Sequence, residues 1–310
     1  MEKINSIFII KQMLENNSFD REQLLKILES FQYDIPVVPI LLLQDQKVLR
    51  TRSNEDDFFG FVHELSYPPA EFARTDRASL NGAPMFYATA FTKNVDNTHA
   101  YPRIVSALET MTLLRTRESD GVKCMTQSVW HVKKPIHLFA FPFSNKYKRA
   151  CEEIGVLNAG WESLVCNNHT EEAIEFFSYI GDMMAETNVS CLYNITATCV
   201  DYILTHFNFD GVIYPSVPVE GQGLNICLKP SIVDENIEFA GAVTEIIFKN
   251  GDKSRIETLA NAKMIDSNSF EWIITDEGKA WMLASGVVGK DVGDKTIVVR
   301  SQTLFAQEGS

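Results

Sequence analysis

Hydrophobic residues recur at two different spacings along the chain, which predicts both helices and strands. Residues 1 to about 34 are expected to form two short helices. The second opens at Asp20, with Gln23 three residues later in the manner of a capping box, and then carries leucine and isoleucine at helical spacing. The apolar run from Pro36 to Leu43 fits either a buried strand or an apolar linker.

The middle of the chain carries turn-forming residues and then a second amphipathic pattern. The segment from Ser53 to Gly82 is rich in turn formers, so Arg77 is expected on a loop. Residues 85–88 are strand-like, and residues 101–114 predict a helix beside whose apolar stripe Glu109 lies. That stripe comprises Ile104, Val105, Leu108, Met111 and Leu114.

The remaining chain predicts strands and helices in alternation, followed by a β-rich end. The expected strands are 127–132, 136–141, 211–214, 242–249 and 296–300, and the expected helices are about 146–155, 170–187 and 191–206. Turns are predicted at Asn250-Gly251, at Asp276-Glu277-Gly278 and within 221–225. The fold class is therefore α+β, with no internal repeat.

Composition and charge narrow the classes of function. At 310 residues with 45% hydrophobic content, the chain can bury a sizeable core. Its formal net charge of -13 argues against a general binder of nucleic acid or membrane surfaces, because a polyanion meets a repulsive mean field. An anionic substrate would have to be held by a local group of arginines.

Six cysteines are dispersed without a Cys-x-x-Cys pair, and the histidines show no metal-ligand spacing. We therefore expect free thiols that fill the core, and no metal. The apolar run near the N-terminus is too short for a secretory signal, and about 18 consecutive apolar residues occur nowhere else. These observations predict a cytoplasmic protein.

Three arginines are candidates for holding a pyrophosphate. The guanidinium fork of Arg50, Arg52 or Arg77 can donate two parallel hydrogen bonds and stays charged at any working pH. The alternative is that they are surface arginines paired with the abundant acidic residues. No single arginine decides between these interpretations.

Three further residues could carry chemistry. Tyr87 could present its ring to a base, or it could be a half-buried packing residue. Glu109 could point into a cleft or lie on an exposed helix edge, and Ser216 follows a buried-looking strand without a nucleophile-elbow motif. The glycines at 221 and 223 lack the Lys-Ser/Thr of a phosphate loop, so a turn is favoured.

Taken in order, these motifs resemble the RES-domain family, named for its Arg, Glu and Ser. The resemblance covers roughly residues 45–232 and depends on the order and spacing of its pieces. They are Arg50-Thr51-Arg52, Glu64-Leu65 with Pro68-Pro69, Arg77, Phe86-Tyr87-Ala88, Ala107-Leu108-Glu109, Asp210 to Ser216 and Gly223 to Ile226. Two departures are Ala78-Ser79, where many members have Asn, and the competition of Arg50 and Arg52 for the first arginine position.

The resemblance implies an ADP-ribosyltransferase-like split β core with flanking helices, in an enzyme that cleaves the nicotinamide-ribose bond of NAD. Arg50 or Arg52 together with Arg77 would hold the diphosphate, Tyr87 would pack beside the nicotinamide, Glu109 would bind the ribose and Ser216 would orient the substrate. Many members are toxins paired with a separate antitoxin. The implied organisation is a helical extension (1–44), a catalytic domain (45–235) and a β-rich extension (236–310).

Three functions remain open from the sequence. The first is an NAD glycohydrolase or phosphorylase acting as a toxin or defence effector, with NAD as its substrate. The second is a protein ADP-ribosyltransferase, since the same residues could serve a protein acceptor. The third is a catalytically silent nucleotide-binding or interaction module.

Overall fold

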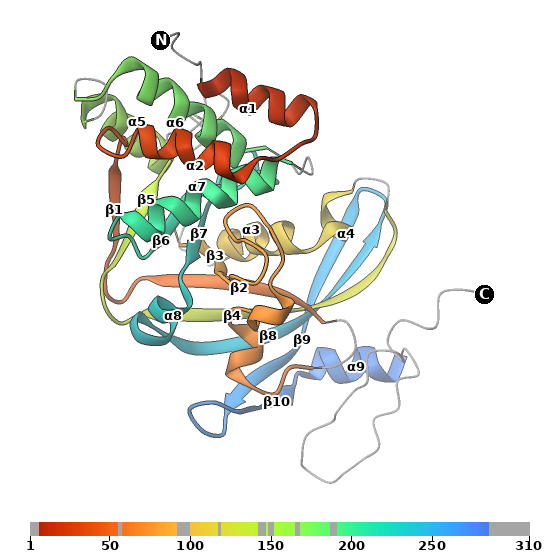
Figure 1. Ribbon diagram of the computed structural model, residues 1–310. Coiled ribbons are helices and arrows are strands. Elements are labelled where there is room, and N and C mark those ends of the chain that lie inside the picture. The colour runs from red at the N-terminus through yellow and green to blue at the C-terminus, as the bar shows by residue number, and fades with distance from the viewer. Residues whose placement is uncertain are drawn as a thin grey trace. The chain divides into compact units, whose positions relative to one another are not determined.

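A computed structural model describes residues 6–54, 58–91, 100–116, 119–141, 147, 152–164, 168–186 and 191–284 (Figure 1). The chain divides into two compact units, and each is described by itself. The first unit comprises Met1–Gln46, Tyr67–Asn94 and Val132–Ile237. The second comprises Lys47–Ser66, Val95–His131 and Glu238–Ser310.

A sheet with the strand order β1-β5-β6-β7-β3 forms the centre of the first unit. Only β5 and β6 are parallel, whereas β1–β5, β6–β7 and β7–β3 are antiparallel pairs. All five residues of β6 and of β7 are buried, as expected for the inner strands of a sheet. The bounds are β1 Val38–Leu42, β3 Phe86–Ala90, β5 Ile136–Ala140, β6 Gly211–Pro215 and β7 Leu224–Leu228.

Helices gather beside the strands of this unit, with α2 and α6 packed against α7 and α1 against α6 (Figure 1). Asp20 caps α2 by accepting the Gln23 backbone N–H at 3.0 Å, as predicted. An aromatic cluster of Phe31, Phe176 and Phe177 joins α2 to α6. The bounds are α1 Ser6–Glu15, α2 Arg21–Ser30, α5 Glu152–Leu164, α6 Glu171–Met184, α7 Leu192–His206, α8 Pro230–Asn236 and the short η2 Ala70–Phe72.

The second unit has the strand order β2-β4-β8-β9-β10, with antiparallel pairing of β2–β4, β8–β9 and β9–β10. Helix α3 packs on β2, and α9 packs on β9. A small core cluster of Ala107, Met111, Met125 and Ile247 joins this helical segment to the strands. The bounds are β2 Lys47–Asn54, β4 Gly121–Val132, β8 Ile237–Asn250, β9 Lys253–Met264, β10 Phe270–Ile274, α3 Ala100–Thr110, α4 Thr112–Arg115, α9 Asp276–Ala284 and η1 Val62–Leu65.

The protein is thus a mixture of helices and strands, and most of the predicted elements are present. Three predictions need correction. The helix expected at about 146–155 continues to Leu164 as α5, with the acidic side chains of Glu152 and Glu153 in its first turn, whereas residue 146 and residues 148–151 lie outside the described residues. Ile104 is exposed, and the helix expected over 101–114 is interrupted at Met111, which is extended and buried.

The turn predicted at 276–278 is instead the start of α9. Thr275 explains this, because its hydroxyl accepts the Gly278 backbone N–H at 2.9 Å and so caps the helix.

The strand predicted at 296–300 lies outside the described residues, as do Cys151 and Cys166. Cys124, Cys191 and Cys199 are free and buried, and Cys227 is buried as well.

Candidate functional site

Arg77 lies in a tight turn between η2 and β3, in the first unit, on the loop that the sequence predicts. An isolated bridge between Asp76 and Ser79 closes the turn, and the Asp76 carboxylate accepts the Arg77 backbone N–H at 2.7 Å. The turn directs the arginine inward, and only 8% of its surface is exposed. A charged side chain this buried needs compensating partners.

The Arg77 guanidinium contacts a carbonyl group and two aromatic rings. It donates to the Met184 carbonyl at the end of α6 and to the Tyr193 hydroxyl at 3.3 Å. Its carbon lies 5.4 Å from the centroid of the Tyr193 ring and 5.6 Å from that of Tyr214. Within the part of the chain that the structure describes, no carboxylate forms an ion pair with it.

These contacts support two roles for Arg77. One is structural, because a cation at the carboxyl end of a helix binds the last carbonyls and offsets the helix dipole. The other is the binding of an anion, because π faces and a carbonyl compensate a buried positive charge only in part. A phosphate group would supply the negative charge that the described protein groups do not.

Tyr87, on β3, forms hydrogen bonds with the turn that carries Arg77. Its hydroxyl accepts the Ala78 backbone N–H at 3.0 Å and donates to the Ser79 hydroxyl at 3.0 Å. Burial, followed by the nearby Cys227, Asp76 and Tyr214, raises the pKa of Tyr87 well above its usual range. The hydroxyl therefore stays protonated, which excludes Tyr87 as a base and leaves its ring and its support of the Arg77 turn as roles.

Ser216 directly follows β6 and is fully buried. Its backbone N–H donates to the Gly223 carbonyl at 2.8 Å, and its own carbonyl accepts the Gly221 N–H at 2.8 Å. Glu220 and Gly221 both adopt positive φ angles, of 51° and 77°, in the connection from β6 to β7. The predicted turn at these glycines is confirmed, and it fixes Ser216 at the end of β6.

Arg50 and Arg52 stand two residues apart on β2, in the second unit, so both lie on the same face of that strand. Thr51 lies on the opposite face, where it meets Ser106 of α3 at 2.7 Å. Arg52 donates to the Glu64 carbonyl and lies over the Phe59 ring at 5.3 Å. Arg52 therefore helps to order η1 and the loop that leads into it.

Glu109 is half-buried near the end of α3, also in the second unit. The next residue, Thr110, donates its hydroxyl to the Thr51 carbonyl at 3.3 Å. This contact fixes the turn of helix that carries Glu109 against β2. The six predicted residues are thus divided, with Arg77, Tyr87 and Ser216 in the first unit and Arg50, Arg52 and Glu109 in the second.

Sequence reasoning missed a buried polar network in the second unit. Gln127 of β4 and Glu245 of β8 both contact Arg103 of α3. A signal was available, because Arg103, Ser106 and Thr110 recur at helical spacing and predict a polar stripe along one face of α3. Helix α3 therefore packs on the strands through this polar stripe as well as through apolar residues.

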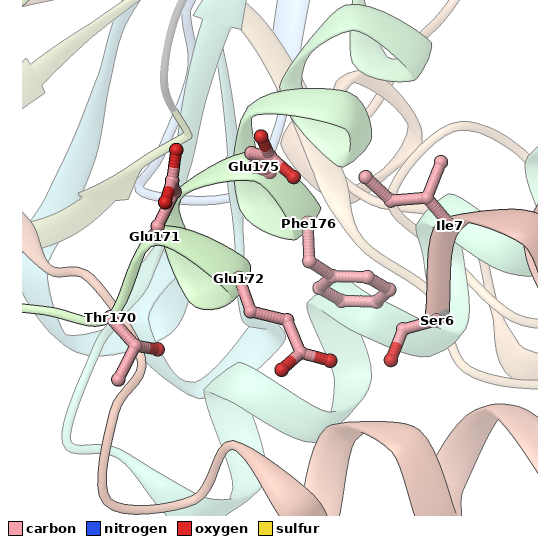
Figure 2. A pocket seen from close by; sticks show the side chains of 7 residues that line it. All are labelled: Ser6, Ile7, Thr170, Glu171, Glu172, Glu175 and Phe176. Carbon is pink, nitrogen blue, oxygen red and sulfur yellow. The ribbon is translucent and has the colours of Figure 1, made fainter. Parts of the chain in front are cut away.

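A separate pocket of about 570 Å³ lies in the first unit. It is lined by Ser6, Ile7, Thr170, Glu171, Glu172, Glu175 and Phe176. Figure 2 shows the Phe176 ring between Glu172 and Ser6. None of the six predicted site residues lines it, and its carboxylates would repel an anionic substrate.

The chain matches no protein-family model and no curated protein. Among the described residues, no group of three or more His, Cys, Asp or Glu side chains could hold a metal ion. In the same residues no helix has both the length and the apolar character needed to cross a membrane.

Proposed function

We propose that the protein is a RES-type enzyme that cleaves the nicotinamide-ribose bond of NAD. The observation that carries this proposal is the environment of Arg77, a buried guanidinium between two tyrosine rings with no carboxylate partner in the described residues. A diphosphate joined to aromatic bases suits such a group, because it offers both negative charge and flat rings. The motifs that resemble the RES family, taken in their order, are the reason for proposing NAD as the substrate.

In this proposal Arg77, with Arg50 or Arg52, binds the diphosphate, and Tyr87 packs beside the nicotinamide. Glu109 hydrogen-bonds the ribose, and Ser216 orients the nicotinamide or the ribose. The fold proposed with this function is the ADP-ribosyltransferase-like split β core. The proposed biological role is that of a toxin or defence effector controlled by a separate protein.

The proposed residues suit the chemistry of glycosidic cleavage. The bond breaks through an oxocarbenium-like state, and a carboxylate such as that of Glu109 stabilises the developing positive charge electrostatically. Nicotinamide leaves as a neutral molecule. Water would complete hydrolysis and phosphate would complete phosphorolysis, while a protein acceptor would make the enzyme an ADP-ribosyltransferase.

Nicotinamide release from NAD by the purified protein, with and without phosphate, tests the proposal. Glu109→Gln keeps the size of the side chain but removes its charge, and we expect it to lower kcat at least about 100-fold, as loss of an electrostatic stabiliser does. Glu271→Gln is the matched control, because Glu271 pairs with Lys263 on the strands β9 and β10. It should retain wild-type kcat.

Each outcome separates one function from the others. Release that depends on phosphate identifies a phosphorylase, and release without phosphate identifies a glycohydrolase. Transfer of labelled ADP-ribose to protein identifies an ADP-ribosyltransferase. A wild-type protein that binds NAD without releasing nicotinamide would overturn the proposal in favour of a binding module.

A further inference from the structure

Helix α3 is held on the strands of the second unit by polar contacts along one face. Ser106 and Thr110 reach β2 through the Thr51 hydroxyl and the Thr51 carbonyl respectively. Arg103, one turn earlier, reaches β4 and β8. Directional hydrogen bonds fix both the rotation and the axial position of a helix, whereas an apolar face permits small slides.

Gln127, which lies on β4, also connects this stripe to β2. Its amide donates to the Thr51 hydroxyl at 3.1 Å and to the Arg103 carbonyl at 2.8 Å, and its oxygen accepts from Arg103 Nε at 3.0 Å. Gln127, Thr51 and Ser106 are all buried. Because each member is satisfied by the others, a shift of α3 would leave several buried polar groups without partners.

Glu245 completes the network from the C-terminal part of the chain. It is 5% exposed, lies on β8 and forms an ion pair with Arg103. Burial raises the pKa of the Glu245 carboxyl, and Arg103 offsets only part of that effect. Buried ion pairs of this kind contribute little net stability, since desolvation cancels much of the attraction, but they can specify one geometry.

We propose that Glu245 is a positioning residue that acts through Arg103 to hold α3, and therefore Glu109, in a fixed place on β2. The inference rests on the proposed function of Glu109. It assigns to β8, which lies beyond the region of RES resemblance, a part in the reaction. The β-rich C-terminal segment then supports the carboxylate that stabilises the ribose in the transition state.

The adjacent residue provides a matched control. Thr244 is fully buried and bonds the Thr126 hydroxyl at 2.8 Å, and Thr126 in turn donates to Asn54 at 2.9 Å. Arg52 pairs with Thr126, whereas Thr51 pairs with Gln127, so the Thr244 contact lies on the face of the strands away from the α3 network. Thr244→Val therefore removes a buried hydrogen bond from the same strand without touching α3.

The test compares Glu245→Gln with Thr244→Val in three measurements. We expect Glu245→Gln to lower kcat for nicotinamide release about tenfold while the KM for NAD changes less than about twofold. Amide hydrogen exchange across residues 103–110 should become about tenfold faster in the same variant. Thr244→Val should leave kcat and the rate of amide exchange within about twofold of their wild-type values. The unfolding free energy of each variant is the third measurement.

The outcomes separate the positioning role from the proposed function. Unchanged kcat and unchanged exchange in Glu245→Gln would overturn the positioning role while NAD cleavage stands. Equal losses in Thr244→Val would also overturn it, because they would reduce it to general stability. If the wild-type protein releases no nicotinamide, the proposed function is wrong, and Glu245 then has no part in catalysis. The exchange data would still show whether Glu245 holds α3 on the strands.

Discussion

The guanidinium carbon of Arg77 lies 5.6 Å from the centroid of the Tyr214 ring, so a loop residue is anchored on the strand that leads to Ser216. Tyr214 is paired with Asn225 across β6 and β7, which fixes the position of its ring in the sheet. This contact brings together two segments whose order along the chain is known from the sequence, but whose proximity in space is not. It also places a permanent cation beside Tyr214, the penultimate residue of β6, two residues before Ser216.

We expect Arg77→Lys to raise the KM for NAD about tenfold, or about 1.4 kcal/mol in binding free energy. Lysine keeps the charge but loses the planar fork that reaches the Met184 carbonyl and lies over two rings. The measurement is steady-state nicotinamide release at varied NAD. Arg21→Lys is the control, since Arg21 forms an exposed ion pair with Asp201, and it should leave the KM unchanged.

The cost of Arg77→Lys to stability distinguishes the two roles of this arginine. A purely structural role would lower the unfolding free energy and leave the KM of the folded fraction at its wild-type value. A ligand-binding role would raise the KM at temperatures where the variant is fully folded. A KM within about twofold of the wild type would contradict the assignment of Arg77 to NAD.

Tyr87 allows the contributions of ring and hydroxyl to be separated. Tyr87→Phe should lower the unfolding free energy by about 1 kcal/mol, because the Ala78 N–H and the Ser79 hydroxyl lose their partner. It should keep nicotinamide release, since the ring remains, whereas Tyr87→Ala should lower kcat/KM at least about tenfold. Chemical denaturation and steady-state kinetics measure the two effects. Tyr33→Phe, at a residue that is 94% exposed, should change neither quantity.

Local patterns predicted most elements because each is fixed by its own residues. The helical spacing after Asp20 and the apolar run from Pro36 to Leu43 both correspond to observed elements, and the glycines after Ser216 form the predicted turn. The loop position of Arg77 likewise follows from the turn formers around it. These are signals that extend over only a few neighbouring residues.

Features that depend on distant partners were not predictable in this way. The partners of Arg103 come from β4 and β8, and Tyr193 and Tyr214, which flank Arg77, come from α7 and β6. No local pattern marks such pairs before the strands are assembled. The start of α9 was missed for a different reason, because Asp-Glu-Gly was interpreted as a turn although Thr275 before it could cap a helix.

Acid should destabilise the protein in part through Asp34. Burial raises the pKa of Asp34, but hydrogen bonds from Thr170 and His169 outweigh this effect and hold the pKa below its ordinary value of 3.8. A lowered folded pKa gives stability that is present above the unfolded pKa and is lost as the pH falls through the folded value. The unfolding free energy of the wild type should therefore decrease as the pH falls below about 4.

The Asp34→Asn variant isolates that contribution. At neutral pH it should be less stable than the wild type, and the difference should shrink as the pH falls below about 4, where Asp34 itself becomes protonated. Urea unfolding at a series of pH values measures the difference. Asp276→Asn, at a side chain that is 96% exposed and pairs only with exposed Lys279, should show a difference that changes much less with pH. A constant difference for Asp34→Asn would contradict the hydrogen-bonded role of this carboxylate.

Gly211, in the segment Asp210 to Ser216, is required by the close approach of β7. A Cβ atom at this position would lie 2.2 Å from the Cys227 carbonyl oxygen and 2.9 Å from Leu228 Cδ2. Because β6 is paired with both β5 and β7, neither neighbour can move away without breaking sheet hydrogen bonds. Gly211→Ala should therefore lower the unfolding free energy by about 3 kcal/mol or prevent folding.

Gly155 is the matched substitution in the same unit. It lies inside α5, and a Cβ atom there would meet nothing within 4 Å. Gly155→Ala should raise the unfolding free energy by about 0.5 kcal/mol, because alanine favours the helix and restricts the unfolded chain. Opposite signs for the two variants in urea unfolding would establish that contact with β7, rather than the loss of glycine itself, makes position 211 intolerant. Equal stability of Gly211→Ala and the wild type would show that the two strands are not held this closely in solution.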